Sequence, residues 1–146
     1  MKRILAIITF AAIACTFANA RHTDEWKEKM RSEKIAFLTM EMNITPEEAQ
    51  VFWPVYNQVE QQKDAALGEV IQAYKALNAA VESNENVEKC LNAYLQAQDK
   101  LREIDSKAAQ QYKAVLPIEK VAKLYTGEEK FRRQHIRNLR NNQANK

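Results

Sequence analysis

Apolar residues recur at three- and four-residue intervals through most of the chain, which is the spacing of one face of an α-helix. Four segments carry this pattern: residues 25–42, 46–81, 87–116 and a last segment from 118 onward. The 146 residues include only two glycines and three prolines, and good helix formers dominate the rest. We therefore predict an all-α protein built from four helices.

The clearest helix start lies at residues 44–48, Ile-Thr-Pro-Glu-Glu. Thr45 is a good N-cap, Pro46 suits the first helical position, and Glu48 stands three residues after the cap. A threonine and a glutamate at this spacing form a capping box, in which each side chain bonds to the other's backbone N–H. We predict that Ile44, Thr45 and Glu48 form the helix-cap motif of the second helix.

The second and third segments carry near-heptad apolar stripes and are joined by a short polar stretch, residues 82–86. Lys63 interrupts the first of these stripes. Two helices of similar length joined in this way form an antiparallel hairpin. Because the second helix would be roughly 50 Å long, we expect an elongated four-helix arrangement with a long antiparallel hairpin.

The two ends of the chain set the expected domain bounds. Residues 1–20 combine a basic start, an apolar run and a small-residue site, Ala18-Asn19-Ala20, and read as a secretory signal peptide. Pro117 starts a fourth helix, in which Gly127 is a soft point. Beyond Arg140 no apolar stripe continues, so we expect a helical domain over residues 21–140 and a frayed tail over 141–146.

The signal peptide predicts a periplasmic location. Cys15 lies in a stretch that loosely resembles a lipoprotein box, and its lipidation would anchor the protein to a membrane. A signal cleaved after Ala20 leaves Cys90 as the only cysteine, so an internal disulfide is excluded. Cys90 is then either a small buried residue or a link between two chains.

Charge is distributed unevenly along the chain. Residues 21–129 hold 14 basic and 19 acidic residues, whereas residues 130–146 hold no acidic residue and six basic ones: Lys130, Arg132, Arg133, Arg137, Arg140 and Lys146. Cations near a helix C-terminus stabilise the helix itself. They can also attract acidic polypeptides, lipid head groups or the acidic part of a second copy. We single out Arg132, Arg133 and Arg137 as candidate partner-binding residues.

Phe52, Trp53 and Tyr56 form the densest aromatic cluster in the chain, around Pro54. A proline inside a helix removes one backbone hydrogen bond, so we expect a bend there. The three aromatics can wedge the helices together as part of the core. Exposed on a bent helix, they would instead mark a concave surface for a polypeptide client or partner.

No phosphate-binding loop, paired-cysteine motif, zinc-protease motif or nucleophile elbow occurs in the sequence. We therefore expect no enzyme activity and no cofactor. Met30, Met40 and Met42, with His22 near the predicted mature N-terminus, could offer ligands to Cu(I), although methionines on such a helix also fill cores. His135 lies among arginines and is expected to be a surface residue.

The residues Ile44, Thr45 and Glu48 resemble the LTxxQ motif of the Spy/CpxP family of periplasmic stress proteins, with glutamate in place of glutamine. Near the last helix, residues 116–120 keep the leucine of a second motif but lack its threonine and glutamine. Residues 52–57 (Phe-Trp-Pro-Val-Tyr-Asn) and 120–125 (Lys-Val-Ala-Lys-Leu-Tyr) are similar to an exported helical group of Bacteroidetes-type bacteria, described as sensors linked to ECF-type sigma factors.

This resemblance implies a periplasmic ATP-independent chaperone or envelope-stress protein that binds unfolded polypeptides, with an antiparallel cradle-shaped homodimer as the expected assembly. An alternative is a signalling accessory that binds a membrane sensor or an anti-sigma factor. A metal-binding sensor is the third possibility. No nucleic-acid partner is expected, and membrane attachment is expected only if Cys15 is lipidated.

Overall fold

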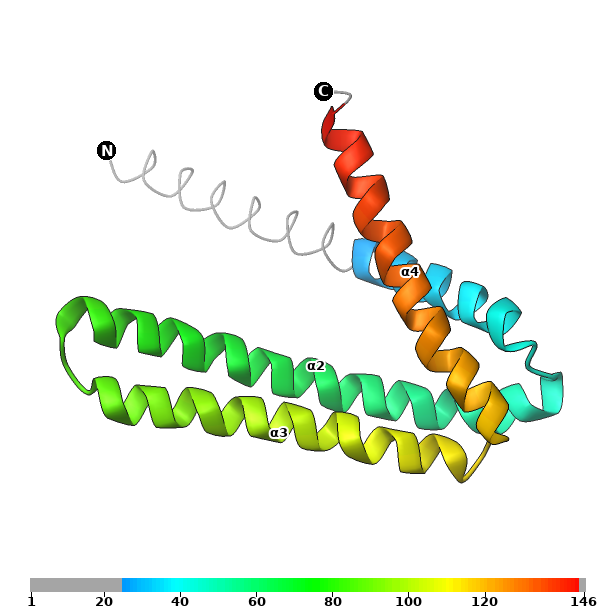
Figure 1. Ribbon diagram of the computed structural model, residues 1–146, viewed down its shortest axis with the longest axis horizontal. Coiled ribbons are helices and arrows are strands. Elements are labelled where there is room, and N and C mark those ends of the chain that lie inside the picture. The colour runs from blue at the N-terminus through cyan, green and yellow to red at the C-terminus, as the bar shows by residue number, and fades with distance from the viewer. Residues whose placement is uncertain (1–24, 145–146) are drawn as a thin grey trace, which may run out of the picture. The chain divides into compact units, whose positions relative to one another are not determined.

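The computed structural model describes residues 25–144, with side chains as far as residue 141, and every regular element in this range is a helix. Residues 25–42 form the first described helix, and the others are α2 (Pro46–Ser83), α3 (Val87–Lys113) and α4 (Ile118–Ala144) (Figure 1). The prediction of an all-α protein with four helices is confirmed. The predicted signal peptide, with Cys15, lies outside the described residues.

The chain divides into two compact units, and both the first helix and α4 contribute to each of them. One unit is Met42–Leu124, which holds α2, α3 and the first turns of α4. The other unit joins Met1–Glu41 to Tyr125–Lys146, of which residues 25–41 and 125–144 are described.

The capping box at the start of α2 forms as predicted. Thr45 has extended backbone, its hydroxyl accepts a hydrogen bond from the Glu48 N–H, and its own N–H donates to Glu48 Oε2 at 2.9 Å. Pro46 occupies the first helical position. Two backbone donors that the helix itself leaves unpaired are thereby satisfied, so the helix start is fixed locally.

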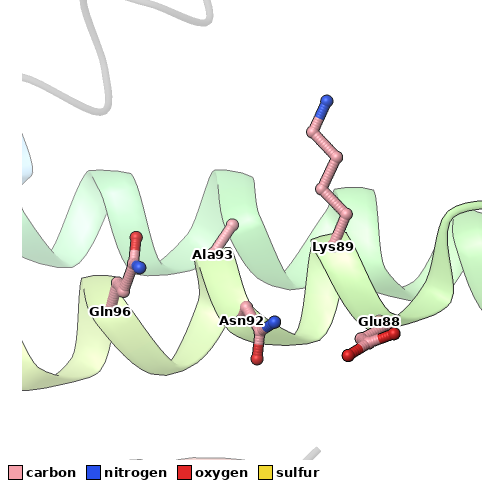
Figure 2. A pocket seen from close by; sticks show the side chains of 5 residues that line it. All are labelled: Glu88, Lys89, Asn92, Ala93 and Gln96. Carbon is pink, nitrogen blue, oxygen red and sulfur yellow. The ribbon is translucent and has the colours of Figure 1, made fainter.

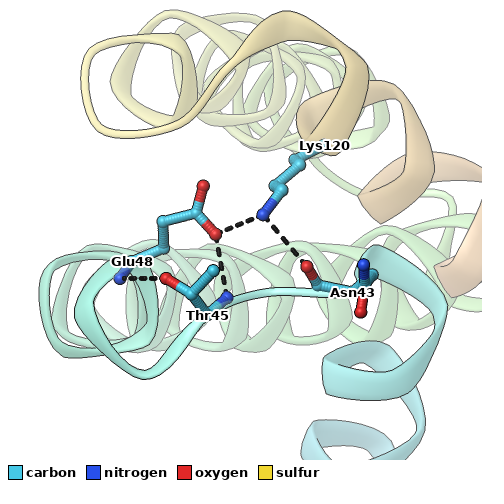
Figure 3. A network of polar contacts seen from close by, with 4 residues as sticks. All are labelled: Asn43, Thr45, Glu48 and Lys120. Atoms are coloured by element: carbon cyan, nitrogen blue, oxygen red, sulfur yellow. Dashed lines mark hydrogen bonds and ion pairs between the residues drawn. The ribbon is translucent and has the colours of Figure 1, made fainter.

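The capping box is extended by a lysine from the start of α4 (Figure 3). Lys120 Nζ forms an ion pair with the Glu48 carboxylate and donates to the Asn43 carbonyl oxygen at 3.0 Å. Asn43 has a positive φ of 47°, a conformation that asparagine tolerates better than most residues. One lysine thus joins the turn before α2 to the first turn of α4.

The helix α2 continues through Pro54 without interruption. It contains 38 residues and is therefore about 57 Å long at 1.5 Å per residue. The predicted end at residue 81 is two residues short, because Asn84 closes the helix in a left-handed conformation and donates to the carbonyls of Ala80 and Val81. Asparagine is one of the residues that adopt this conformation at a helix end.

Helices α2 and α3 pack side by side in opposite directions, as the sequence predicts for a hairpin (Figure 1). We call the end near Pro46 the base and the turn at residues 84–86 the tip. Lys63 forms an ion pair with Asp105 at 2.9 Å, and Lys100 forms one with Glu69 at 2.6 Å. The centres of the Tyr74 and Tyr94 rings lie 6.2 Å apart. These three contacts fix one antiparallel register along the hairpin.

The start of α3 at Val87 agrees with the prediction, whereas its end does not. Asn86 occupies the N-cap position, but its side chain forms no capping hydrogen bond. The helix ends at Lys113 rather than near Leu116, because residues 114–116 form a turn before Pro117. The N–H groups of Val115 and Leu116 both donate to the Tyr112 carbonyl in this turn. Leu116 is nevertheless buried.

In the other unit, residues 25–41 pack antiparallel to residues 125–141 of α4. The Phe37 and Phe131 rings are 5.6 Å apart, and Lys34 bonds to Glu128 at 3.1 Å. A Cβ at Gly127 would lie 3.0 Å from Leu38 Cδ2, so this glycine permits close helix packing and is not a break. The helix also runs past Arg140 to Ala144, into the tail that we expected to fray.

His135 is half-buried, contrary to the expectation of a surface residue. Its ring lies 6.1 Å from the Trp26 ring and is stacked on the Phe131 ring at 6.5 Å. The neighbouring arginines along the sequence suggested a solvated position. Trp26 on the facing helix packs against His135 instead. Because Trp26 is 109 residues away in the sequence, hydrophobic periodicity could not predict this contact.

The polar network at the start of α2 predicts a pH-dependent contribution of Glu48 to stability. The Lys120 hydrogen bond, and next the Thr45 backbone hydrogen bond, lower the Glu48 pKa from its ordinary value of 4.5. A carboxylate with a lowered folded-state pKa stabilises the fold at neutral pH, and this contribution is lost as the pH falls through the lowered pKa. Urea unfolding should therefore show Glu48→Gln as destabilising at pH 7 and equal to the unmodified protein at strongly acidic pH.

The matched control for this prediction is Thr45→Ala, which removes the cap hydroxyl and should cost about 1 kcal/mol. The hydroxyl does not titrate, so most of this loss should persist at acidic pH. An equal loss for Glu48→Gln at pH 7 and at acidic pH would contradict the role of the charged network.

Candidate functional site

The predicted aromatic site proves to be core at two of its three positions. Phe52 is fully buried and Tyr56 is 2% exposed, whereas Trp53 is half-buried. Phe52 lies 5.5 Å from Tyr56 and 5.7 Å from Tyr112 of α3, measured between ring centres. Phe52 and Tyr56 are therefore not a client-binding surface, and the wedge interpretation of the cluster is correct for them.

Trp53 extends the same cluster. Its ring is edge-on to the Tyr56 ring at 5.4 Å, and it lies 4.9 Å from the Phe52 ring. Edge-on and tilted pairs at these distances are the favourable arrangements for aromatic rings. Trp53 is thus held in place by the core, and only part of its ring is available to a partner.

The arginines of the predicted partner site are exposed but not all equally available. Glu129 accepts hydrogen bonds from Arg132 at 2.8 and 2.9 Å and from Arg133 at 2.6 Å. The Arg133 bond, followed by the Arg132 bond, lowers the pKa of Glu129, so its carboxylate stays charged beside them. Arg137 is exposed one turn further along α4. The two predicted site groups belong to different units.

The methionines proposed as metal ligands do not share a surface. Met40 is 81% exposed, whereas Met42 is fully buried, and His22 lies outside the described residues. Within the described range, no group of three or more His, Cys, Asp or Glu residues could hold a metal ion. Cys90 is a half-buried free cysteine on α3.

The seam between α2 and α3 follows a regular three-and-four spacing. None of the seam residues is exposed, and they are Phe52, Tyr56, Val59, Lys63, Ala66, Val70, Ala73, Leu77 and Ala80 on α2 and Val87, Cys90, Tyr94, Ala97, Leu101, Ile104, Ala108, Gln111 and Val115 on α3 and the turn that follows it. Two antiparallel helices are related by a two-fold axis perpendicular to the plane that contains them both. Residues that directly follow a seam position therefore lie on the same side of the hairpin in both helices, and residues that directly precede one lie on the other side. The Glu69–Lys100 ion pair agrees with this, since each residue directly precedes a seam position.

The opposite side of the hairpin carries residues that directly follow a seam position, and near the tip most of these are large and apolar. We call this surface the distal face. Tyr74 is 56% exposed and Val81 60% exposed, and the others are between 42% and 46% exposed. The distal face consists of Leu67, Ile71, Tyr74 and Val81 on α2 and Leu91 and Leu95 on α3.

The same side of the hairpin is covered near the base and open near the tip. Trp53 and Tyr112 follow seam positions near the base and are half-buried and buried. Between the two parts, Lys63 forms ion pairs with Asp105 at 2.9 Å and Glu60 at 3.7 Å. This charged cluster separates the aromatic core at the base from the distal face.

One open depression lies on the surface of α3 (Figure 2). In Figure 2 the lining side chains project from successive turns of one helix and do not converge on a common point. They offer no set of groups with an obvious joint chemistry. The depression is lined by Glu88, Lys89, Asn92, Ala93 and Gln96.

No helix in the described part of the chain combines the length and the apolar content that a bilayer crossing needs. Comparisons of the chain with models of protein families, with curated proteins and with solved structures give no match. The resemblance to the Spy/CpxP family and to the exported helical group therefore stays a prediction.

The distal face was not predicted from the sequence. The signal that could have found the face is a second apolar stripe one position after the seam, at Leu67, Tyr74 and Val81, which are seven residues apart. That stripe widens the apolar sector beyond what one partner helix can cover.

The burial of the aromatic cluster predicts which substitutions in it are damaging. Phe52→Ala should lower the free energy of unfolding by about 3–5 kcal/mol, because it leaves a cavity next to Tyr56 and Tyr112. Val51→Ala, at an exposed position one residue earlier, should change it by less than about 0.5 kcal/mol. Urea unfolding followed by helical circular dichroism measures both.

Phe52→Leu keeps most of the volume and supplies a folded variant if Phe52→Ala fails to fold. An unfolding free energy for Phe52→Ala within 1 kcal/mol of that for Val51→Ala would contradict the core role of Phe52.

Proposed function

We propose that the protein is an exported, ATP-independent chaperone that holds unfolded polypeptides on the distal face. The observation that supports this proposal is the continuous set of six half-exposed apolar residues on one side of the α2–α3 hairpin. Contiguous apolar surface on a soluble helix pair, rimmed by polar residues, is typical of protein interaction sites. The resemblance to periplasmic stress proteins points to the same class of partner.

The expected affinity suits transient holding. Fully burying a side chain such as leucine or isoleucine is worth about 1.5–3 kcal/mol, so covering the exposed half gives about 1 kcal/mol for each residue. Six such residues give about 6 kcal/mol before the entropic cost of association is subtracted. Individual segments should then bind weakly and exchange rapidly, and tight holding would require several contacts along one unfolded chain.

Side-chain variety on the distal face is also consistent with a broad range of clients. Tyr74 supplies an aromatic ring with a polar edge, and the leucines, Ile71 and Val81 supply aliphatic surface. None of these contacts demands a particular hydrogen-bond pattern in the partner. Apolar sequence content, and not one exact sequence, should therefore decide what binds.

An aggregation assay tests the proposal. The purified protein at near-stoichiometric ratio should slow the light scattering of a chemically denatured client diluted from urea, without nucleotide. The double variant Ile71→Ser/Leu95→Ser removes one apolar residue from each helix of the distal face. It should lose most of this protection while its helical circular dichroism is unchanged.

The matched control is Met40→Ser/Ile118→Ser, which also removes two exposed apolar side chains but none from the distal face. This variant should protect the client as well as the unmodified protein does. No protection by the unmodified protein at tenfold excess, or equal loss in both double variants, would count against the proposal.

The second candidate function is that of a signalling accessory, and the end of α4 favours it. Ile136 and Leu139 are exposed on the same stretch as the basic residues Arg132, Arg133 and Arg137. Apolar and arginine side chains together are common in specific protein interfaces. Saturable binding to one folded envelope protein, combined with no protection in the aggregation assay, would favour this alternative.

A further inference from the structure

We propose that the preferred occupant of the distal face is a cationic amphipathic helix, that is, a client segment with apolar residues on one side and lysine or arginine on the others. This inference rests on the proposed function and names the class of segment that the face selects. It is carried by the carboxylates around the face and by the helix that covers the base of the same unit.

Carboxylates lie at both ends of the distal face. Asp64 follows the seam residue Lys63, and Glu88 follows the seam residue Val87, so both share the side of the hairpin that carries the distal face. Glu82, near the tip, is exposed and accepts a hydrogen bond from Asn78 at 3.1 Å. These three carboxylates form no ion pair within residues 25–144, so they can accept a partner's cations.

The cations of the hairpin cancel only part of this charge. Residues 64–105 contain eight acidic and four basic residues. Lys100 is paired with Glu69 and Arg102 with Asp99, whereas Lys75 and Lys89 are exposed, and the excess of carboxylates remains. An apolar face with unpaired carboxylates at its rim attracts a segment of opposite charge and disfavours an acidic one.

A helix suits this face better than an extended strand. An amphipathic helix can lay apolar residues at i, i+3, i+4 and i+7 along the exposed apolar side of a helix pair. The hairpin offers no sheet edge on which a strand could pair. At the base, the first turns of α4 lie beside the start of α2 through Lys120, and Val121 and Leu124 there are buried.

A second copy of the chain is a poorer occupant. Its basic segment is the end of α4, where Ile136 and Leu139 are the large aliphatic residues exposed between residues 130 and 141. Two anchors cannot cover six apolar residues spread over both helices. A client helix with four apolar anchors on one side matches the distal face better, so the observations favour a foreign segment.

The test uses three fluorescent peptides of 18 residues and measures binding to the purified protein by anisotropy at low salt. The first has leucines at i, i+3, i+4 and i+7 and lysines at the other charged positions. The second replaces the lysines by glutamates, and the third is a scrambled version of the first. The lysine peptide should bind at least tenfold more tightly than either of the other two peptides. Raising the salt concentration should weaken the binding of the lysine peptide.

Two sets of variants separate the charge contribution from the apolar one. Asp64→Asn/Glu82→Gln/Glu88→Gln should weaken binding of the lysine peptide by roughly three- to thirtyfold. The control Glu25→Gln/Glu28→Gln/Glu119→Gln removes the same number of exposed carboxylates elsewhere and should change it by less than about twofold. Ile71→Ser/Leu95→Ser should weaken both the binding of the lysine peptide and the protection of the denatured client.

Several results would overturn the inference. Equal binding of the lysine and glutamate peptides, together with normal protection of the denatured client, would remove the charge preference and leave the proposed function standing. Absence of both peptide binding and client protection would remove the two together. If the protein forms dimers in the absence of peptide, and the Asp64→Asn/Glu82→Gln/Glu88→Gln variant is monomeric, the occupant of the distal face is a second copy of the chain.

Discussion

Two packed helices can hide only the stripes that face each other, and this limit governs the α2–α3 hairpin. Both helices carry apolar residues on the seam and also directly after it, so each apolar sector is wider than one partner can cover. At the base, the extra width is absorbed into a core that contains Phe52, Tyr56 and Tyr112. Near the tip, no part of the described chain buries the apolar residues next to the seam to the same extent, and these residues form the distal face.

Polar contacts decide where the covered part ends. Lys120 joins the start of α4 to Glu48 and to the Asn43 carbonyl, so it helps to hold the covering residues at the base. Lys63, with Asp105 and Glu60, interrupts the apolar side of the hairpin before Leu67. Such ion pairs contribute little net stability. Their larger effect is to mark the change from buried core to exposed apolar surface.

Local signals in the sequence were sufficient for the elements. The capping box at Thr45 and Glu48 formed as predicted because both groups lie within four residues of each other. The same holds for the hairpin turn, where asparagine tolerates the backbone conformation that ends α2. Individual side chains were harder to predict: the sequence left open whether Phe52 and Tyr56 are core or surface, and His135 proved to be half-buried against Trp26. Each of these outcomes depends on a partner residue far away in the chain.

The sequence by itself determined that the protein is all-α, where its helices begin and end to within a few residues, and that two of them form a long antiparallel hairpin. Hydrophobic periodicity and capping chemistry are local, so they can be read without knowing the neighbours. Only the tertiary structure decided which apolar residues are core and which remain exposed. Trp53 and Leu67 both directly follow a seam position, but Trp53 is half-buried and Leu67 is 46% exposed, because the burial of each depends on whether another part of the fold covers that turn of α2.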